Sequence, residues 1–188
     1  MFTNLSRVNH SCQPNAEFVW NNESNAQDLR ATSKIPAGAE ITASYLDLED
    51  GLNKVYRQEF LADNFMFECK CQCCTVIGAR YDEDEDKRTE LMSLHHLLNN
   101  CDTPQTIIKN INQQLKLASL ITGVKTQYCL KLLTIGYETM AGISHSEEIN
   151  NRAEVMYAYA KRALKLCVIL FGPDYCITKY WFSKNKLD

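Results

Sequence analysis

The sequence lacks an excess of positive charge, a secretory leader and any long apolar run. Its 188 residues carry 20 lysines and arginines against 23 aspartates and glutamates, a formal net charge of −3. This balance does not indicate a phosphate-binding surface, so we expect no direct contact with nucleic acid. No charged and then apolar leader opens the chain, and no apolar run is long enough to span a bilayer. We therefore expect neither secretion nor a membrane partner.

Cysteine, by contrast, is abundant, with nine residues of which four are clustered near the middle of the chain. Cys69, Cys71 and Cys74 have C-x-C-x-x-C spacing, and three thiolates need a fourth ligand to complete a tetrahedral zinc site. Cys12 is the natural donor, because it lies in a polar, turn-rich segment that is otherwise unusual for a buried thiol. The sequence therefore predicts a structural Zn²⁺ site; a cluster of free or oxidised thiols is the alternative.

The remaining cysteines separate into one ambiguous ligand and four solitary residues. Spacing favours Cys74 over Cys73 as a ligand but does not decide between them. Four others lie singly in apolar helical patterns, where cysteine behaves as a small buried hydrophobe: Cys101, Cys129, Cys167 and Cys176. This layout favours zinc over disulfides and indicates a reducing, intracellular compartment.

The first part of the chain has the patterns of strands followed by one helix. Residues 16–20 alternate and are rich in β-formers, and residues 27–33 return as a second strand of a hairpin. A turn containing proline and glycine precedes a third predicted strand at 40–45. From residue 52 the apolar period changes to that of a helix, which we expect to end near residue 64.

The second part of the chain is predicted to be helical. Residues 82–86 are five consecutive carboxylates, which repel one another and which we interpret as a solvated linker. Beyond them, apolar residues recur at three- and four-residue steps, and Thr103-Pro104 has the pattern of a helix start. Small residues such as Ala160 allow helices to approach closely, as in stacked helical repeats; a plain helical bundle is the alternative.

Three motifs occur in order: N-H-S-C-x-P-N at 9–15, I-x-A-G-x-E-I-T-x-S-Y at 35–45 and F-E-C-x-C-x-x-C at 67–74. Together they resemble the C-terminal half of a SET domain with its post-SET zinc lobe, most closely that of the SET-and-MYND lysine methyltransferases. The resemblance implies an α+β chain in three parts, the last of them an α-helical, tetratricopeptide-like domain. Those parts are the C-terminal part of a SET domain (1–47), a post-SET helix and zinc lobe (48–80) and the helical domain (81–188).

The same resemblance assigns roles to four residues. Asn9 and His10 match a pair that contacts S-adenosylmethionine, and Phe67 matches an aromatic residue that packs on the adenine ring. Tyr45 matches the tyrosine that closes the active site and orients the neutral lysine amine, whose pKa in free lysine is about 10.4. The alternatives are a turn asparagine, a packed histidine, ordinary packing of the aromatic ring and a tyrosine of a β-sheet.

The resemblance also sets expectations for the protein as a whole. It implies a protein-lysine methyltransferase acting on histone or non-histone substrates in the cytoplasm and nucleus, with a helical domain able to bind partner proteins. Phe65 falls where relatives commonly carry a tyrosine in the lysine channel, which bears on the number of methyl groups transferred. The chain begins almost directly at Asn9, so we expect SET strands upstream and weak cofactor binding without them. A non-catalytic, zinc-stapled interaction module is the alternative function.

Overall fold

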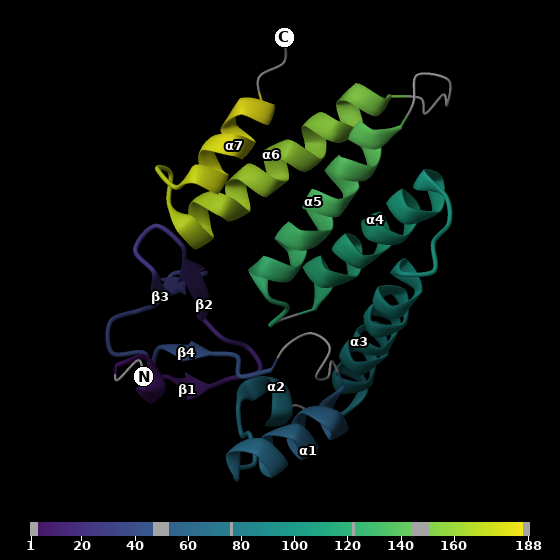
Figure 1. Cartoon of the computed structure of the whole chain (residues 1–188). Coiled ribbons are helices and arrows are strands. Elements are labelled where there is room, and N and C mark those ends of the chain that lie inside the picture. Colours follow the sequence, from purple (N-terminus) through teal and green to yellow (C-terminus); the bar gives the residue numbers. More distant parts are fainter. Residues whose placement is uncertain (1–3, 47–52, 76, 122, 144–150, 186–188) are drawn as a thin grey trace.

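The chain, in this computed structural model, combines a small β-rich part with a series of packed helices (Figure 1). The structure describes residues 4–46, 53–75, 77–121, 123–143 and 151–185. A short 3₁₀ helix and four strands come first: η1 (Leu5–Arg7), β1 (Asn9–His10), β2 (Ala16–Asn21), β3 (Ala26–Ala31) and β4 (Thr42–Ala43). Seven described helices follow: α1 (Lys54–Phe65), α2 (Gln72–Thr75), α3 (Ala79–Leu98), α4 (Pro104–Leu120), α5 (Thr126–Gly142), α6 (Arg152–Phe171) and α7 (Cys176–Lys184).

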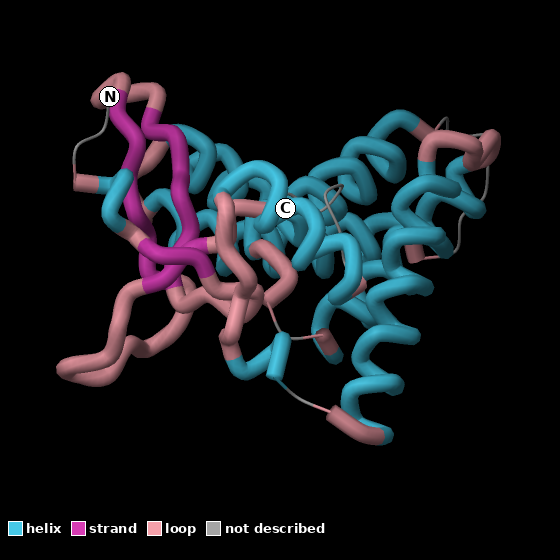
Figure 2. Tube along the Cα trace, turned by 90° about the horizontal axis from the view of Figure 1, so that it is seen from below, coloured by secondary structure: helices cyan, strands magenta, loops and turns pink. Residues whose placement is uncertain are grey.

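The strands form two separate two-stranded sheets, gathered on one side of the molecule (Figure 2). β2 and β3 pair antiparallel with Ala16 opposite Ala31, which confirms the predicted hairpin. β4 pairs in parallel with β1, with Asn9 opposite Thr42. The third predicted strand is therefore shorter than expected, because β1 offers only two residues before the chain turns away at Ser11.

The helices α3 to α7 pack against one another in chain order. Their buried side chains form one core, which includes Leu91, Ile111, Leu133 and Trp181. Val19 of β2 belongs to the same core, so the β-hairpin is packed onto the helical part. Stacking in chain order is common to helical bundles and helical repeats, so the tetratricopeptide-like domain stays a prediction. None of the described helices is both long and apolar enough to cross a membrane.

Helix ends follow the predicted signals at several places. Thr103 is the N-cap of α4, with its side chain accepting a hydrogen bond from the Thr106 backbone, and Pro104 occupies the first turn. Gly172 ends α6 with a φ of +86°, a left-handed conformation that glycine adopts without strain. One prediction about a solitary cysteine is wrong: Cys176 is exposed at the start of α7, because it occupies the solvent face of that helix.

The interpretation of residues 82–86 as a linker is also wrong, because these residues lie inside α3. Their charges are paired on the helix itself, with Lys87 donating to Glu83 at 2.5 Å and Arg88 donating to Asp84 at 2.9 Å. Such pairs at i and i+4 stabilise a helix and offset the repulsion between neighbouring carboxylates. The helix also crosses the boundary predicted between residues 80 and 81, whereas the other predicted boundary, at 47/48, lies outside the described residues.

Glu85 of the same acidic run joins α3 to the cysteine-rich part of the chain. Its carboxylate accepts hydrogen bonds from the Lys54 backbone N–H at 2.6 Å and from the Arg57 guanidinium at 3.3 Å. Arg57 and Arg88 are both buried, and both donate to the sulfur of Cys73. A carboxylate at the N-terminus of α1 is favourable for the helix dipole. Glu85 is therefore part of a packed interface, whereas Asp82, Glu83 and Asp86 are exposed.

Candidate metal and active site

Four cysteine sulfurs converge on one point between β1 and α2. The Sγ atoms of Cys12, Cys69, Cys71 and Cys74 all lie within 4.8 Å of one another. Cys12 Sγ is 3.5 Å from that of Cys74 and 3.9 Å from that of Cys69. A tetrahedral zinc ion with Zn–S bonds of about 2.3 Å separates its sulfurs by about 3.8 Å. The cluster brought together by the fold is therefore compatible with zinc.

The four thiols of this cluster differ in their pKa values. Hydrogen bonding from Cys12 holds the pKa of Cys69 far below its usual range and lowers that of Cys71 to about 5. The pKa of Cys12 is raised in return, first by its hydrogen bond to Cys69. The pKa of Cys74 is also raised, because the lowering effect of its hydrogen bond to Cys12 is outweighed by its hydrogen bonds to Cys69 and Cys71 and by its burial. A soft divalent cation requires deprotonated ligands, so metal binding here would release protons from Cys12 and Cys74. Four protein thiolates leave no open position, which is the arrangement of structural zinc.

Cys73 lies outside this cluster among the described residues. Its sulfur accepts hydrogen bonds from Arg88 at 3.4 Å and from Arg57 at 3.7 Å. Burial raises the pKa of the Cys73 thiol in spite of the two nearby guanidinium groups. The geometry thus places Cys74 with the other three sulfurs and directs Cys73 toward α3.

His10 links the cysteine cluster to the end of β4. The Tyr45 backbone N–H donates to His10 Nδ1 at 3.0 Å, so the imidazole is neutral and carries its proton on Nε2. Nε2 lies 3.3 Å from Cys12 Sγ and donates to it. Hydrogen bonds from neighbouring groups to the ligands orient metal sites in general, and His10 could act in this way on Cys12. The His10 ring is therefore engaged within the protein at both of its nitrogens.

An aromatic cluster surrounds Tyr45. The Tyr45 ring centroid lies 4.8 Å from that of Phe65, 5.3 Å from that of His10 and 6.3 Å from that of Phe67, the last edge to face. The Tyr45 hydroxyl donates to the Val8 carbonyl at 2.6 Å. This bond fixes the phenol and leaves its oxygen able to accept one from a neighbouring group.

Asn9 is placed apart from these rings. Its side chain is exposed, and its amide donates to the Glu40 carboxylate at 2.6 Å. Asn15 also bridges this region, because its amide donates to the Glu40 carbonyl while its oxygen accepts from the Thr42 N–H. The asparagines thus fix the β1–β4 pair, and the contact of Asn9 with a cofactor stays a prediction.

Comparison with known proteins places these features in a family. Residues 1–46 match the SET domain family. We call these residues the SET segment. The wider chain is similar to SET-and-MYND type methyltransferases, as its motifs predicted.

Three relatives illustrate the similarity. The histone-lysine N-methyltransferase set5 of Schizosaccharomyces pombe is 33% identical over 95 residues, 50% of this chain and 29% of the relative. The histone-lysine N-methyltransferase SMYD3 of Mus musculus is 36% identical over 89 residues, 47% of this chain and 19% of the relative. Smyd1 of Mus musculus, also a histone-lysine N-methyltransferase, is 25% identical over 183 residues, 83% of this chain and 37% of the relative. The chain thus spans well under half the length of these relatives.

Two adjoining pockets open beside Tyr45 of the SET segment. They share four lining residues: Phe18, Gln27, Tyr45 and Phe65. The pocket of about 440 Å³ is lined further by Leu5, Ser6 and Val8. The other, of about 360 Å³, is more polar and is lined further by Glu17, Ser44, Lys125 and Gln127. Tyr45 therefore faces space large enough for a side chain, with α5 forming part of the wall.

Sequence reasoning missed Glu17, Lys125 and Gln127 in this site. Glu17 carries a weak signal, because a carboxylate on an otherwise apolar strand must find buried partners. Lys125 and Gln127 carry none, since they join the SET segment only through the packing of distant parts of the chain.

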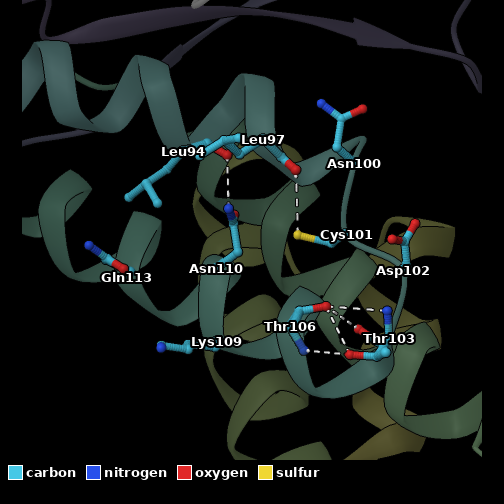
Figure 3. Close-up of a pocket in the computed structure, with 10 residues that line it drawn as sticks. All are labelled: Leu94, Leu97, Asn100, Cys101, Asp102, Thr103, Thr106, Lys109, Asn110 and Gln113. Atoms are coloured by element: carbon cyan, nitrogen blue, oxygen red, sulfur yellow. Dashed lines mark hydrogen bonds between the residues drawn. The ribbon is translucent and has the colours of Figure 1, made fainter.

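A third pocket, of about 430 Å³, lies between the C-terminal end of α3 and the start of α4 (Figure 3). Its polar groups bond within the protein: Asn110 donates to the Leu94 carbonyl, and Cys101 donates to the Leu97 carbonyl. It contains none of the predicted site residues. We assign it no part in the chemistry of the SET segment.

Proposed function

We propose that this protein is a protein-lysine methyltransferase that uses S-adenosylmethionine and acts on histone or other lysine-containing proteins. The observation that carries the proposal is that three of the predicted site residues lie close together. Tyr45, His10 and Phe67 meet beside the four-cysteine cluster, and a pocket opens at Tyr45. The relatives, which bear the name of lysine methyltransferases, support the same reaction.

Each residue has one role in this proposal. S-adenosylmethionine, when bound, would supply a methyl group on a positively charged sulfur that leaves as a neutral thioether, a reaction that needs no metal and no covalent enzyme intermediate. Tyr45 orients the incoming lysine amine, because its oxygen keeps an acceptor site after donating to the Val8 carbonyl. Phe67, the amide of Asn9 and the backbone of His10 would contact the cofactor.

The zinc ion in this proposal has a structural role. It holds the loop of Cys12 against the segment that carries Phe67, and its binding energy is part of the folding energy. The proposed location is the nucleus or cytoplasm, where protein substrates of this kind occur. The helical part is proposed to bind partner proteins.

The test is methyl transfer by the protein in its full natural length. Tritium-labelled S-adenosylmethionine is incubated with core histones and, separately, with an extract of cellular proteins. We expect label in lysine, identified by mass spectrometry, and cofactor binding by calorimetry. Cofactor binding without any lysine methylation would contradict the proposal, and so would the absence of both. The second result would favour a non-catalytic interaction module.

A further inference from the structure

The turn between α4 and α5 is in close contact with the backbone of a zinc-ligand residue. Gly123 in this turn has a φ of +85°. A Cβ atom added at Gly123 would lie 1.9 Å from the Cys12 carbonyl oxygen and 3.0 Å from its carbonyl carbon. Two backbones thus pack without space for a methyl group, although one belongs to the helical part and the other to the SET segment.

Cys12 has little freedom to move away from Gly123. Next to it, the Ser11 backbone N–H donates to the Ala43 carbonyl of β4 at 3.1 Å. On its other side, the Gln13 N–H donates to the Ser11 hydroxyl at 3.1 Å. The Cys12 side chain is buried among the other three cysteines of the cluster. The Cys12 peptide is therefore confined between β4 and the α4–α5 turn.

Glu17 fixes the other end of the same turn. Its carboxylate, only 4% exposed, accepts hydrogen bonds from the backbone N–H groups of Thr126 at 2.5 Å and Gln127 at 3.2 Å. The Gln127 side chain also donates to the Phe18 carbonyl at 2.6 Å. A buried carboxylate that caps a helix start neutralises unpaired N–H groups and the positive end of the dipole. The turn is thus attached to β2 as well as to the Cys12 loop.

We propose that the α4–α5 turn is a positioning element for Cys12. Seated on the Cys12 peptide by Gly123 and attached to β2 through Glu17, it holds the Cys12 sulfur within reach of the other three. Docking of the helical part thereby raises the affinity of the site for zinc. By reciprocity, bound zinc strengthens the docking of the turn. This inference rests on the proposed zinc site.

The experiment measures zinc affinity of the full chain by competition with a chromogenic chelator. Gly123→Ala is expected to weaken zinc binding by about 10- to 100-fold, the range found when groups behind metal ligands are altered. Glu17→Gln, which keeps the shape of the side chain and removes its charge, should also weaken zinc binding, but by less than Gly123→Ala does.

Gly172→Ala is the matched control. Gly172 has nearly the same φ, +86°, yet nothing lies within 4 Å of an added Cβ. This variant also places a side chain at a positive φ and should keep the wild-type zinc affinity. Equal weakening in both glycine variants, or wild-type affinity in folded Gly123→Ala, would overturn the proposal. A wild-type chain without stoichiometric zinc would overturn the zinc site itself.

Hydrogen exchange gives a reading that does not require the variants to fold. Removal of zinc from the wild-type chain should speed exchange at the amides of Thr126 and Gln127, which bond to Glu17. Amides in the middle of α6 serve as the internal reference. Equal change in both segments, or no change at α5, would show that metal and turn are not coupled.

Discussion

The backbone of Tyr45 and the side chain of His10 are joined by a 3.0 Å hydrogen bond from the Tyr45 N–H to Nδ1. The other nitrogen of the ring lies 3.3 Å from Cys12 Sγ. One neutral imidazole thus spans the distance between the proposed catalytic tyrosine and the proposed zinc ligand. We expect a displacement of the Cys12 sulfur to displace the Tyr45 backbone as well, because the His10 ring is hydrogen-bonded to both.

Cys12 and Cys73 should differ sharply in their contribution to zinc binding. Cys12→Ser removes one of four clustered sulfurs, whereas Cys73→Ser removes a sulfur that faces Arg57 and Arg88. We expect one zinc per chain in the wild type and in Cys73→Ser, and strong loss in Cys12→Ser. Metal content by mass spectrometry and thermal unfolding with and without a chelator measure this. Zinc loss in Cys73→Ser with retention in Cys12→Ser would contradict the ligand set.

Tyr45→Phe should reduce methyl transfer by about 100-fold, the loss typical when one orienting hydrogen-bond group is removed from an active site. The aromatic packing with Phe65 and His10 is retained, so cofactor affinity should change by less than about twofold. Single-turnover rates and calorimetry separate the two quantities. Tyr56→Phe, at a tyrosine 42% exposed on α1, is the control and should be silent. A fully active Tyr45→Phe enzyme would remove Tyr45 from the mechanism.

Phe65→Tyr should lower the number of methyl groups that are transferred. The Phe65 ring packs 4.8 Å from that of Tyr45 and lines both pockets, so a hydroxyl there would occupy space and bond the amine. We expect product mixtures to shift toward monomethyl-lysine in intact-mass measurements on a peptide substrate. An unchanged distribution would show that Phe65 does not line the lysine site.

Glu85→Ala and Glu83→Ala should have very different effects on stability, although they lie on the same helix. Glu85 pairs with buried Arg57 and accepts from the Lys54 backbone, so its removal should cost about 3 kcal/mol. Glu83 is 70% exposed and pairs with Lys87. Loss of this exposed ion pair should lower the free energy of unfolding by no more than about 0.5 kcal/mol. Denaturant unfolding measures both values. Similar small losses would show that the acidic run does not join α3 to α1.

Much of the local structure was predictable because it depends on short-range rules. The alternation at residues 16–20 predicted a strand, and Thr103 with Pro104 predicted a helix start; the structure confirms both. The acidic residues at 82–86 misled the prediction, because their partners include Arg57, which is distant in the sequence. Runs of like charge are usually solvated, and the partners of Glu85 could not be read from the run itself, because Arg57 is distant in the sequence.

The sequence by itself determined which groups the candidate site contains: the motifs around Asn9, Tyr45 and Phe67 and the spacing of the cysteine cluster. Tertiary structure alone decided that Cys74 and not Cys73 joins that cluster, and that Gly123 and Glu17 connect the helical part to it. The physical reason is the sequence separation of the interacting residues. Motifs encode which groups a site contains, whereas their distances and burial follow from how remote segments pack together.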